Sequence, residues 1–196
     1  MLGGLFVLLS TVVAGIPFLL GYVARMTRNI IAGDPRPLPE WNDLGEFFGE
    51  GLMLFAVGLI YMLPVSILSI LVGIPAAFVD NISQPGLHDA GAGIVTCASC
   101  VVSMLSFVIT LILPAATLRA IATRRFGAAF ELKDVWAFII GNIGNYLLAL
   151  VIEGVAYVIS FAGIALLCVG VIFTFFWAVV VTGYAFAAVW RAAPQP

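Results

Sequence analysis

Long apolar runs alternate with short polar segments along most of the chain. A membrane-spanning helix needs about 20 mostly apolar residues. Four runs reach that length, and they cover residues 2–24, 52–79, 94–118 and 135–190. Each of the first three predicts one membrane-spanning helix.

The last run is about twice as long as one span needs, and Glu153 is its only charged residue. It must therefore fold back on itself, and we expect the turn near residues 160–163. The pattern predicts an all-α integral membrane protein with a single transmembrane domain over residues 1–196. Its five spans are expected at about 2–24, 52–79, 94–118, 135–159 and 164–190.

Composition supports the membrane class. Apolar residues make up 63% of the chain and charged residues 9%, and the mean hydropathy is +1.20, which is outside the range of soluble domains. So few charges give no basis for a nucleic-acid partner. The lipid bilayer is the expected surrounding of most of the surface.

The eight Lys and Arg residues predict the orientation of the spans, because positive residues in short loops stay on the cytoplasmic side. We expect a multi-pass protein of the cell membrane with its N-terminus outside and its C-terminus in the cytoplasm. The first run lacks a preceding basic segment, so we expect a retained span and not a cleaved signal peptide. This arrangement places on the cytoplasmic side Arg25, Arg28 and Arg36 of the first loop, Arg119, Arg124, Arg125 and Lys133 of the third loop, and Arg191.

Half of the ten acidic residues fall in the segment AGDPRPLPEWNDLGEFFGEG at 32–51. Its alternating prolines predict a stiff, extended spacer. The spacing of Asp43 and Glu46 is that of a capping box, which predicts a helix from about Leu44. We expect a cytoplasmic interfacial elbow that anchors the second span through buried Leu44 and Phe47, with Trp41 at the headgroup level. The candidate interaction residues of this elbow are Pro39, Glu40, Trp41, Asp43, Glu46 and Glu50.

A docking surface or a ligand site is the alternative interpretation of the elbow. Its acids and the basic third loop are predicted to lie on the same membrane face. We therefore expect the two loops to pair, although exposed ion pairs contribute only about 0 to 1 kcal/mol each.

Three segments resemble a known family, and the Leu-Pro-Glu-Trp core at 38–41 is the most specific of the matching residues. The segments are GYVARMTRNIIAGDPRPLPEWNDLGEFFGEGL at 21–52, GAAFELKDVWAFIIGNIGNYLLAL at 127–150 and GYAFAAVWRAA at 183–193. They resemble the uncharacterised multi-pass membrane proteins of archaea and bacteria grouped as domain of unknown function 4013. That family has no assigned activity, so the resemblance implies a membrane protein and supplies no catalytic residue.

A faint internal repeat relates the two cytoplasmic loops. It predicts two parallel hairpins followed by a fifth helix, an arrangement found in transporters and also in membrane proteins that merely duplicated. The matched positions are Arg25 with Arg119, Gly33 with Gly127, Asp43 with Asp134 and Phe47 with Phe138.

Polar and small residues recur every three or four positions on the third and fourth predicted spans, so each forms a stripe on one helix face. We expect the two stripes to pack together through small and hydroxylated side chains. The stripes consist of Thr96, Ser99, Ser103, Ser106 and Thr110, and of Asn142, Asn145, Ala149, Glu153, Ala156 and Ser160.

The candidate intramembrane polar residues are Asn142, Asn145 and Glu153. A buried carboxylate could serve a proton or a cation. A fourth helix that starts at residue 135 would instead place Glu153 near the outer interface, where its charge costs little.

Cys97 and Cys100 form the one pattern typical of an enzyme site. A Cys-x-x-Cys pair at the outer start of the third helix, just after His88 and Asp89, favours thiol chemistry because a helix N-terminus lowers a thiol pKa. A thiol oxidase needs a second pair, and only Cys168 remains. Helix packing is therefore the preferred interpretation, and a zinc site is less favoured still.

The sequence favours a non-enzymatic protein that acts through helix–helix contacts, as a structural or accessory subunit of a membrane assembly. Its expected partners are other membrane proteins or copies of itself, and no cofactor is expected. No nucleotide loop, metal quartet or nucleophile with a base is visible. Two alternatives stay open: a small transporter or ion-conducting subunit that uses the two polar stripes, and a membrane thiol redox protein that uses Cys97 and Cys100.

Overall fold

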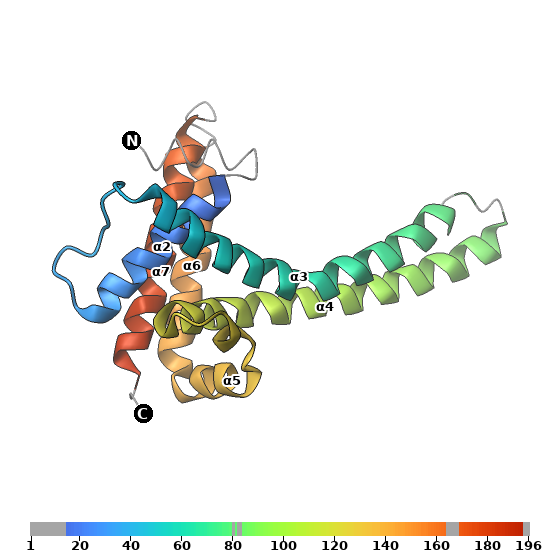
Figure 1. Cartoon of the computed structure of the whole chain (residues 1–196). Helices are drawn as coiled ribbons and strands as arrows, with labels where there is room; N and C mark the ends of the chain where they lie inside the picture. Colours follow the sequence, from blue (N-terminus) through green and yellow to red (C-terminus); the bar gives the residue numbers. More distant parts are fainter. Residues whose placement is uncertain (1–14, 80, 82–83, 164–168, 194–196) are drawn as a thin grey trace. The chain divides into compact units, whose positions relative to one another are not determined.

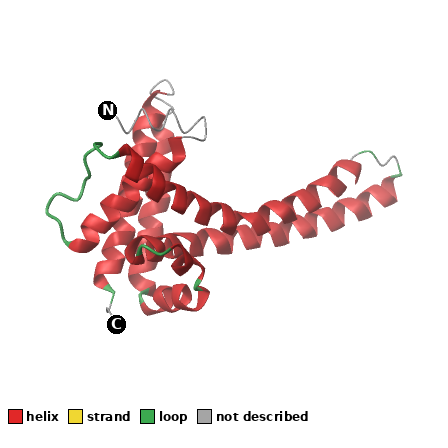
Figure 2. Cartoon of the chain, in the orientation of Figure 1, coloured by secondary structure: helices red, strands yellow, loops and turns green. Residues whose placement is uncertain are grey.

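The computed structural model describes residues 15–79, 81, 84–163 and 169–193 (Figure 1). Helix is the only regular secondary structure in this part of the chain (Figure 2). The all-α prediction is confirmed. In chain order the helices are α2 (Gly15–Ala32), α3 (Leu44–Val79), α4 (Pro85–Thr123), the 3-10 helix η1 (Phe126–Phe130), α5 (Leu132–Gly141), α6 (Ile143–Ala162) and α7 (Val169–Ala192).

Four of the described helices are long and apolar enough to cross a membrane, namely α3, α4, α6 and the part of α7 from Phe173 to Ala192. The chain is a multi-pass membrane protein. The first part of the first predicted span, residues 1–14, lies outside the described residues, so the number of five spans stays a prediction. Prolines inside α3 and α4 are tolerated, as is common in membrane helices.

The chain divides into two units, which we describe separately. The bundle unit comprises Met1–Val57 and Pro114–Pro196, and the hairpin unit comprises Gly58–Leu113. In the hairpin unit, residues 58–79 of α3 and 85–113 of α4 run side by side (Figure 1). A Cβ atom added to Gly91 would lie 2.9 Å from Cγ2 of Val79, so glycine permits close packing near the tip of the hairpin.

In the bundle unit, α7 packs against both α2 and α6. Met26, Ile30 and Ala187 form one buried cluster between α2 and α7. Between α6 and α7, the rings of Tyr146 and Phe186 lie 5.5 Å apart. α7 is therefore the central helix of the described bundle.

Two helices extend further than the apolar pattern predicts. α2 continues through Ala32, so Arg25 and Arg28 lie on a helix and not in a loop. α4 begins at Pro85 instead of residue 94, which shortens the predicted outer loop. Proline suits the first helical position because its φ is already helical and its missing N–H group is not needed there. The helix boundaries follow these backbone preferences, whereas hydropathy reports only the apolar part.

The fourth predicted span, 135–159, is two helices instead of one. The backbone of Asn142, with φ of −129° and ψ of 27°, separates α5 from α6. Its side-chain Nδ2 donates to the carbonyl oxygen of Phe138 at 3.0 Å. Asparagine competes in this way with helical hydrogen bonds, and the preceding Gly141 is also a poor helix former. The predicted turn near 160–163 is confirmed, because α6 ends at Ala162; residues 164–168, where the fifth span was predicted to start, lie outside the described residues.

Candidate functional site at the elbow

The elbow, residues 33–50, connects α2 to the first turns of α3. α2 ends in a Schellman motif, in which Gly33 N–H donates to Ile30 and Asp34 N–H donates to Asn29. Gly33 has a φ of +78°, which glycine adopts without strain. The Nδ2 group of Asn29 donates to the carbonyl oxygen of Pro37 at 3.0 Å. The proline spacer is thus tied back to the helix that precedes it.

Two glycines bring the backbones of α2 and α3 into direct contact. A Cβ atom on Gly21 would lie 1.8 Å from the carbonyl oxygen of Phe47. A Cβ atom on Gly51 would lie 1.6 Å from the carbonyl oxygen of Pro17. Small residues at helix crossings permit such close approach in membrane proteins. No larger residue fits either position without moving the helices apart.

Two ion pairs connect the same helices on the elbow side. Arg25 pairs with Glu46 and Arg28 pairs with Glu50. The hydrogen bond with Glu46 raises the pKa of Arg25 above its ordinary value, so this guanidinium stays charged. The second pair is the more buried one, with side-chain exposures of 14% for Arg28 and 21% for Glu50. The second oxygen of Glu50 is buried without a hydrogen-bond partner within the described residues.

Aromatic side chains fill the angle between α2, the elbow and α7. Trp41 stacks on Tyr22, with ring centroids 4.5 Å apart and an interplanar angle of 12°. Phe47, which is 1% exposed, meets Trp41 edge-on at 5.7 Å, and Phe176 of α7 lies 5.7 Å from Tyr22. The predicted burial of Phe47 is confirmed. The predicted burial of Leu44 is wrong, because it is 41% exposed.

A small polar cavity of about 260 Å³ lies on the elbow. The lining residues combine one guanidinium, two carboxylates and two amides, which suits a small polar group better than an apolar one. Nowhere in the described ranges do three or more His, Cys, Asp or Glu side chains gather as metal ligands would. The cavity is lined by Arg25, Asn29, Pro39, Glu40, Asn42, Asp43 and Phe47.

The predicted elbow candidates therefore divide into two groups. Pro39, Glu40 and Asp43 line the polar cavity. Trp41, Glu46 and Glu50 instead attach the elbow to α2. The sequence thus located the elbow but did not separate its surface residues from its packing residues.

The basic third loop pairs with acids of its own. Arg119 Nη2 lies 3.0 Å from Glu131 and 2.9 Å from Asp134, and Arg125 lies 3.6 Å from Glu131. The prediction that the elbow acids pair with this loop is wrong, because both elbow ion pairs go to α2. Partners that are close along the chain lose less conformational entropy when they meet, which favours pairing within one loop.

The three candidate intramembrane residues have different surroundings. Asn142 caps the break between α5 and α6, and Asn145 is exposed in the first turn of α6. Glu153 is the eleventh of the twenty residues of α6, near the middle of the helix. The helix start at residue 135, on which its predicted place near the outer interface depended, is wrong, because the helix starts at Ile143. The depth of Glu153 in the membrane stays a prediction. An ionised carboxylate is most costly at mid-span.

The small-residue face of α6 packs on α7. Ala149, Ala156 and Ser160 are buried, and Thr174 of α7 donates a hydrogen bond to the Ser160 carbonyl oxygen at 2.8 Å. On α4, Ser106 and Thr110 donate instead to carbonyl oxygens of their own helix. The partner that the structure gives to the α6 stripe is therefore α7, and packing against the α4 stripe stays a prediction.

Cys97 and Cys100 are free and exposed. They are the thirteenth and sixteenth residues of α4, which begins at Pro85. The effect of a helix N-terminus is confined to the first turn, so the predicted reason for an activated thiol is wrong. His88 and Asp89 lie on the same helix, with His88 Nδ1 3.5 Å from Asp89 Oδ1.

Comparison with known families supports the resemblance noted above. A family model described as a protein of unknown function, DUF4013, matches residues 4–169. The chain belongs to this family. The match includes the complete elbow, the hairpin unit and α6, whereas α7 after its first residue lies beyond it. Neither a curated protein nor a solved structure matches the chain.

Sequence reasoning missed the α2 side of the DUF4013 elbow. The apolar pattern places Gly21 and Tyr22 in the first predicted span and Arg28 in the loop after it. One signal was present: Arg25 and Arg28 are one helical turn apart, as are Glu46 and Glu50. Matching spacing of opposite charges on two adjoining helices indicates a pair of ion pairs between them.

Proposed function

We propose that this DUF4013 protein is a structural or accessory subunit of a membrane assembly and has no catalytic activity of its own. It works in this proposal through helix contacts with other membrane proteins or with copies of itself. The observation that supports the proposal is the bare surface of the long helices. In the most apolar stretch of α3 only 6% of the residues are buried, and the same share is buried in α4. In α7 the share is 33%.

The α4 stripe offers the contact surface. Thr96, Ser99 and Ser103 are exposed. Further along the stripe, the hydroxyl of Ser106 donates to Val102 at 2.8 Å and that of Thr110 to Ser106 at 2.9 Å. A hydroxyl that donates to a carbonyl oxygen of its own helix needs no further partner. Such small side chains leave a shallow helix surface, which a second helix can approach closely. Van der Waals packing of this kind is the main attraction between helices in lipid.

Site-specific photo-crosslinking in native membranes tests the proposal. A photoreactive residue at Ser99 or Ser103 should give one product of discrete mass, either a dimer of the chain or a complex with another protein. The matched controls are Val101 and Met104, which are 63% and 72% exposed on other faces of α4. Equal crosslinking at all four positions, or only lipid adducts at all four, would contradict the proposed contact.

The proposal includes the orientation, with the N-terminus outside and all basic residues on the cytoplasmic side. The distribution of Lys and Arg supports it. Cysteines introduced at exposed Asn81 or Gln84 should react with an impermeant thiol reagent added to intact cells. Cysteines at Arg36 or Arg124 should react only after the membrane is opened. The reverse pattern would overturn the orientation.

A second candidate function is the passage of protons or cations, favoured by the position of Glu153 at the middle of α6. Within the described residues, no ion pair involves Glu153. A lone mid-span carboxylate is a candidate relay for a proton or a cation. In reconstituted vesicles, Glu153→Gln should abolish dissipation of an imposed ion gradient, while Asn145→Ala should not. Absence of any flux with the unchanged protein would exclude this function.

A further inference from the structure

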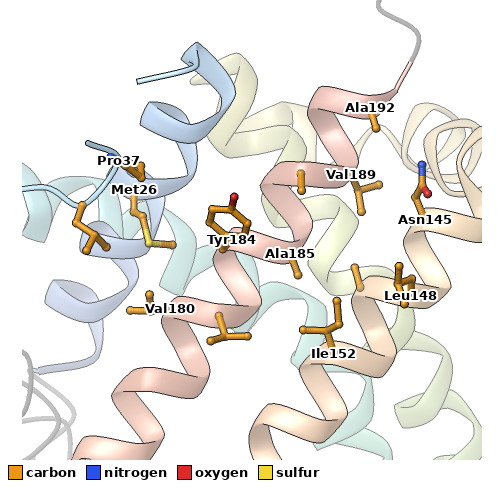
Figure 3. A pocket seen from close by; sticks show the side chains of 14 residues that line it. Met26, Pro37, Asn145, Leu148, Ile152, Val180, Tyr184, Ala185, Val189 and Ala192 are labelled. Atoms are coloured by element: carbon orange, nitrogen blue, oxygen red, sulfur yellow. The ribbon is translucent and has the colours of Figure 1, made fainter. Parts of the chain in front are cut away.

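A larger cavity, the apolar groove, lies in the bundle unit between α2, the proline spacer, α6 and α7 (Figure 3). Its volume is about 660 Å³. Asn145 and Tyr184 carry the only polar side-chain groups of its lining, and no lining residue is charged. The groove is lined by Met26, Pro37, Leu38, Asn145, Leu148, Ala149, Ile152, Val180, Val181, Tyr184, Ala185, Ala188, Val189 and Ala192.

The groove has the length of one lipid leaflet. Val180 and Ala192 lie at its opposite ends along α7 (Figure 3), and twelve helical residues rise about 18 Å. The hydrocarbon core of a bilayer is about 30 Å thick, so one leaflet contributes about half of that. An extended acyl chain aligned with α7 therefore matches the groove in length and in polarity.

Basic residues adjoin one end of the groove. Arg36 directly precedes Pro37, and Arg191 directly precedes Ala192; Pro37 and Ala192 lie towards the same end (Figure 3). In the described ranges the side chains of Arg36 and Arg191 form no ion pair. Four other arginines of the bundle unit are each paired with an acid. Unpaired guanidinium groups near an apolar groove complement the phosphate of an anionic lipid.

Exposed apolar side chains support the same occupant. Leu38 and Leu148 line the groove but are 58% and 59% exposed. Leu38 lies in the polar elbow, between Arg36 and Glu40. Contact with water is unfavourable for a large apolar side chain at this place. A lipid chain in the groove would cover both residues.

We propose that the apolar groove binds one acyl chain of an anionic glycerophospholipid whose phosphate is held by Arg36 and Arg191. Tyr184 and Asn145 then face the more polar part of the lipid, near its ester groups. The site thus binds an anionic lipid as a specific ligand, whereas the rest of the bilayer only surrounds the protein as a solvent.

Native mass spectrometry of the full-length protein, taken from nanodiscs with equal amounts of phosphatidylglycerol and phosphatidylcholine, tests this proposal. We expect one retained lipid, predominantly phosphatidylglycerol. Ala188→Trp fills the groove from an exposed position and should remove the retained lipid. Val158→Trp, which introduces the same side chain at a 71% exposed position of α6 outside the groove, should keep it. Leu38→Asn, a small change in the elbow, should weaken retention without affecting the helices.

The charge requirement has its own matched pair of variants. Arg36→Gln with Arg191→Gln should reduce the preference for phosphatidylglycerol over phosphatidylcholine by roughly 30-fold, as expected for the loss of two basic contacts. Arg124→Gln with Lys133→Gln removes two other basic residues and should leave the preference unchanged. Excess inorganic phosphate, which carries the charge without an acyl chain, should not displace the lipid.

Three results would overturn the proposal. The first is unchanged lipid retention by Ala188→Trp or Leu38→Asn in protein whose thermal unfolding is normal. The second is an equal loss of the preference for phosphatidylglycerol in the Arg36/Arg191 variant and in the Arg124/Lys133 control. That result would indicate that the anionic lipid is attracted to all basic residues of this face. The third is a dimer that the groove variants dissociate, which would make a second copy the occupant.

Discussion

The bundle unit contains two corners in which an arginine-bearing helix turns into a helix that begins with acids. In the first corner, Arg25 of α2 pairs with Glu46 of α3; in the second, Arg119 of α4 pairs with Asp134 of α5. The internal repeat aligns the arginines with each other and Asp43 with Asp134. Both corners thus neutralise their charges locally, and neither needs the other for this purpose.

The corners differ in how their helices meet. Gly21 and Gly51 let the backbones of α2 and α3 touch in the first corner. The repeat places Ala115 and Asn142 at the corresponding positions of the second corner. There the helix breaks at Asn142, whereas α3 continues unbroken past Gly51. The comparison teaches that ion pairs are the common feature of both corners, whereas a glycine backbone contact shapes the first corner and a helix break at Asn142 shapes the second.

The largest expected effect is that of Gly51→Leu. Its Cβ would overlap the Pro17 carbonyl oxygen, which belongs to backbone and cannot move aside, so we expect loss of about 3 kcal/mol or more of unfolding free energy. Gly49→Ala, at an open helical position, should be neutral or stabilise the protein. Denaturant unfolding in detergent measures both. A tolerated Gly51→Leu would show that the first corner is not closed by backbone contact.

Trp41→Ala should have the next largest effect. It removes the stack on Tyr22 and the edge contact with Phe47, at a cost of about 3 kcal/mol. The control is Trp136 of the second corner, which is 58% exposed, and its replacement by Ala should cost less than about 1 kcal/mol. Equal losses in thermal unfolding would mean that the aromatic cluster does not distinguish the corners.

The ion pairs of the two corners should differ less in their contribution to the free energy of unfolding. Arg28→Gln leaves Glu50 charged and only 21% exposed, so we expect a loss of about 2 kcal/mol. Arg119→Gln leaves Glu131 and Asp134, which are 39% and 52% exposed and keep access to water, so the loss should be about 1 kcal/mol or less. Double-mutant cycles with Glu50→Gln and Asp134→Asn isolate the pair energies. A larger coupling for the second corner would contradict this order.

The smallest effect is expected at the helix ends. Arg124 has a φ of 53° just after α4, in the left-handed region that Gly33 occupies after α2. Arg124→Gly should therefore stabilise the protein by up to about 1 kcal/mol, because a non-glycine residue is strained there. Gly33→Ala should destabilise it by a similar amount. If both changes lower the melting temperature, Arg124 is held in place by contacts that outweigh its strain.

Several features of the fold followed from the sequence by simple physical rules. The apolar runs predicted α3 and α6 as spans, and the capping pattern placed the start of α3 at Leu44. Hydropathy did not detect the break at Asn142, because a single asparagine beside a glycine hardly lowers the mean hydropathy of a long apolar run. The same boundary error placed Glu153 nineteen residues into its predicted helix, whereas it is the eleventh residue of α6.

In the elbow too, some features followed from the sequence and others did not. Its prolines, its tryptophan and its acids marked it as a distinct segment in the sequence, because backbone restriction and charge are properties of single residues. Which charges meet was a question of distance between helices, and the choice between the α2 arginines and the third loop could not be made from residue types alone.

The sequence by itself determined that this DUF4013 chain is helical, belongs in a membrane and carries its basic residues in two short stretches, 25–36 and 119–133, and at Arg191, because those properties depend on local composition and run length. Only the tertiary structure decided the partners: α2 for the elbow acids, α7 for the small-residue face of α6, and the apolar groove between α2, α6 and α7. All three depend on residues that become neighbours only after folding. For the elbow, Gly21 and Gly51 let the backbones of α2 and α3 touch, which brings the acids to the α2 arginines.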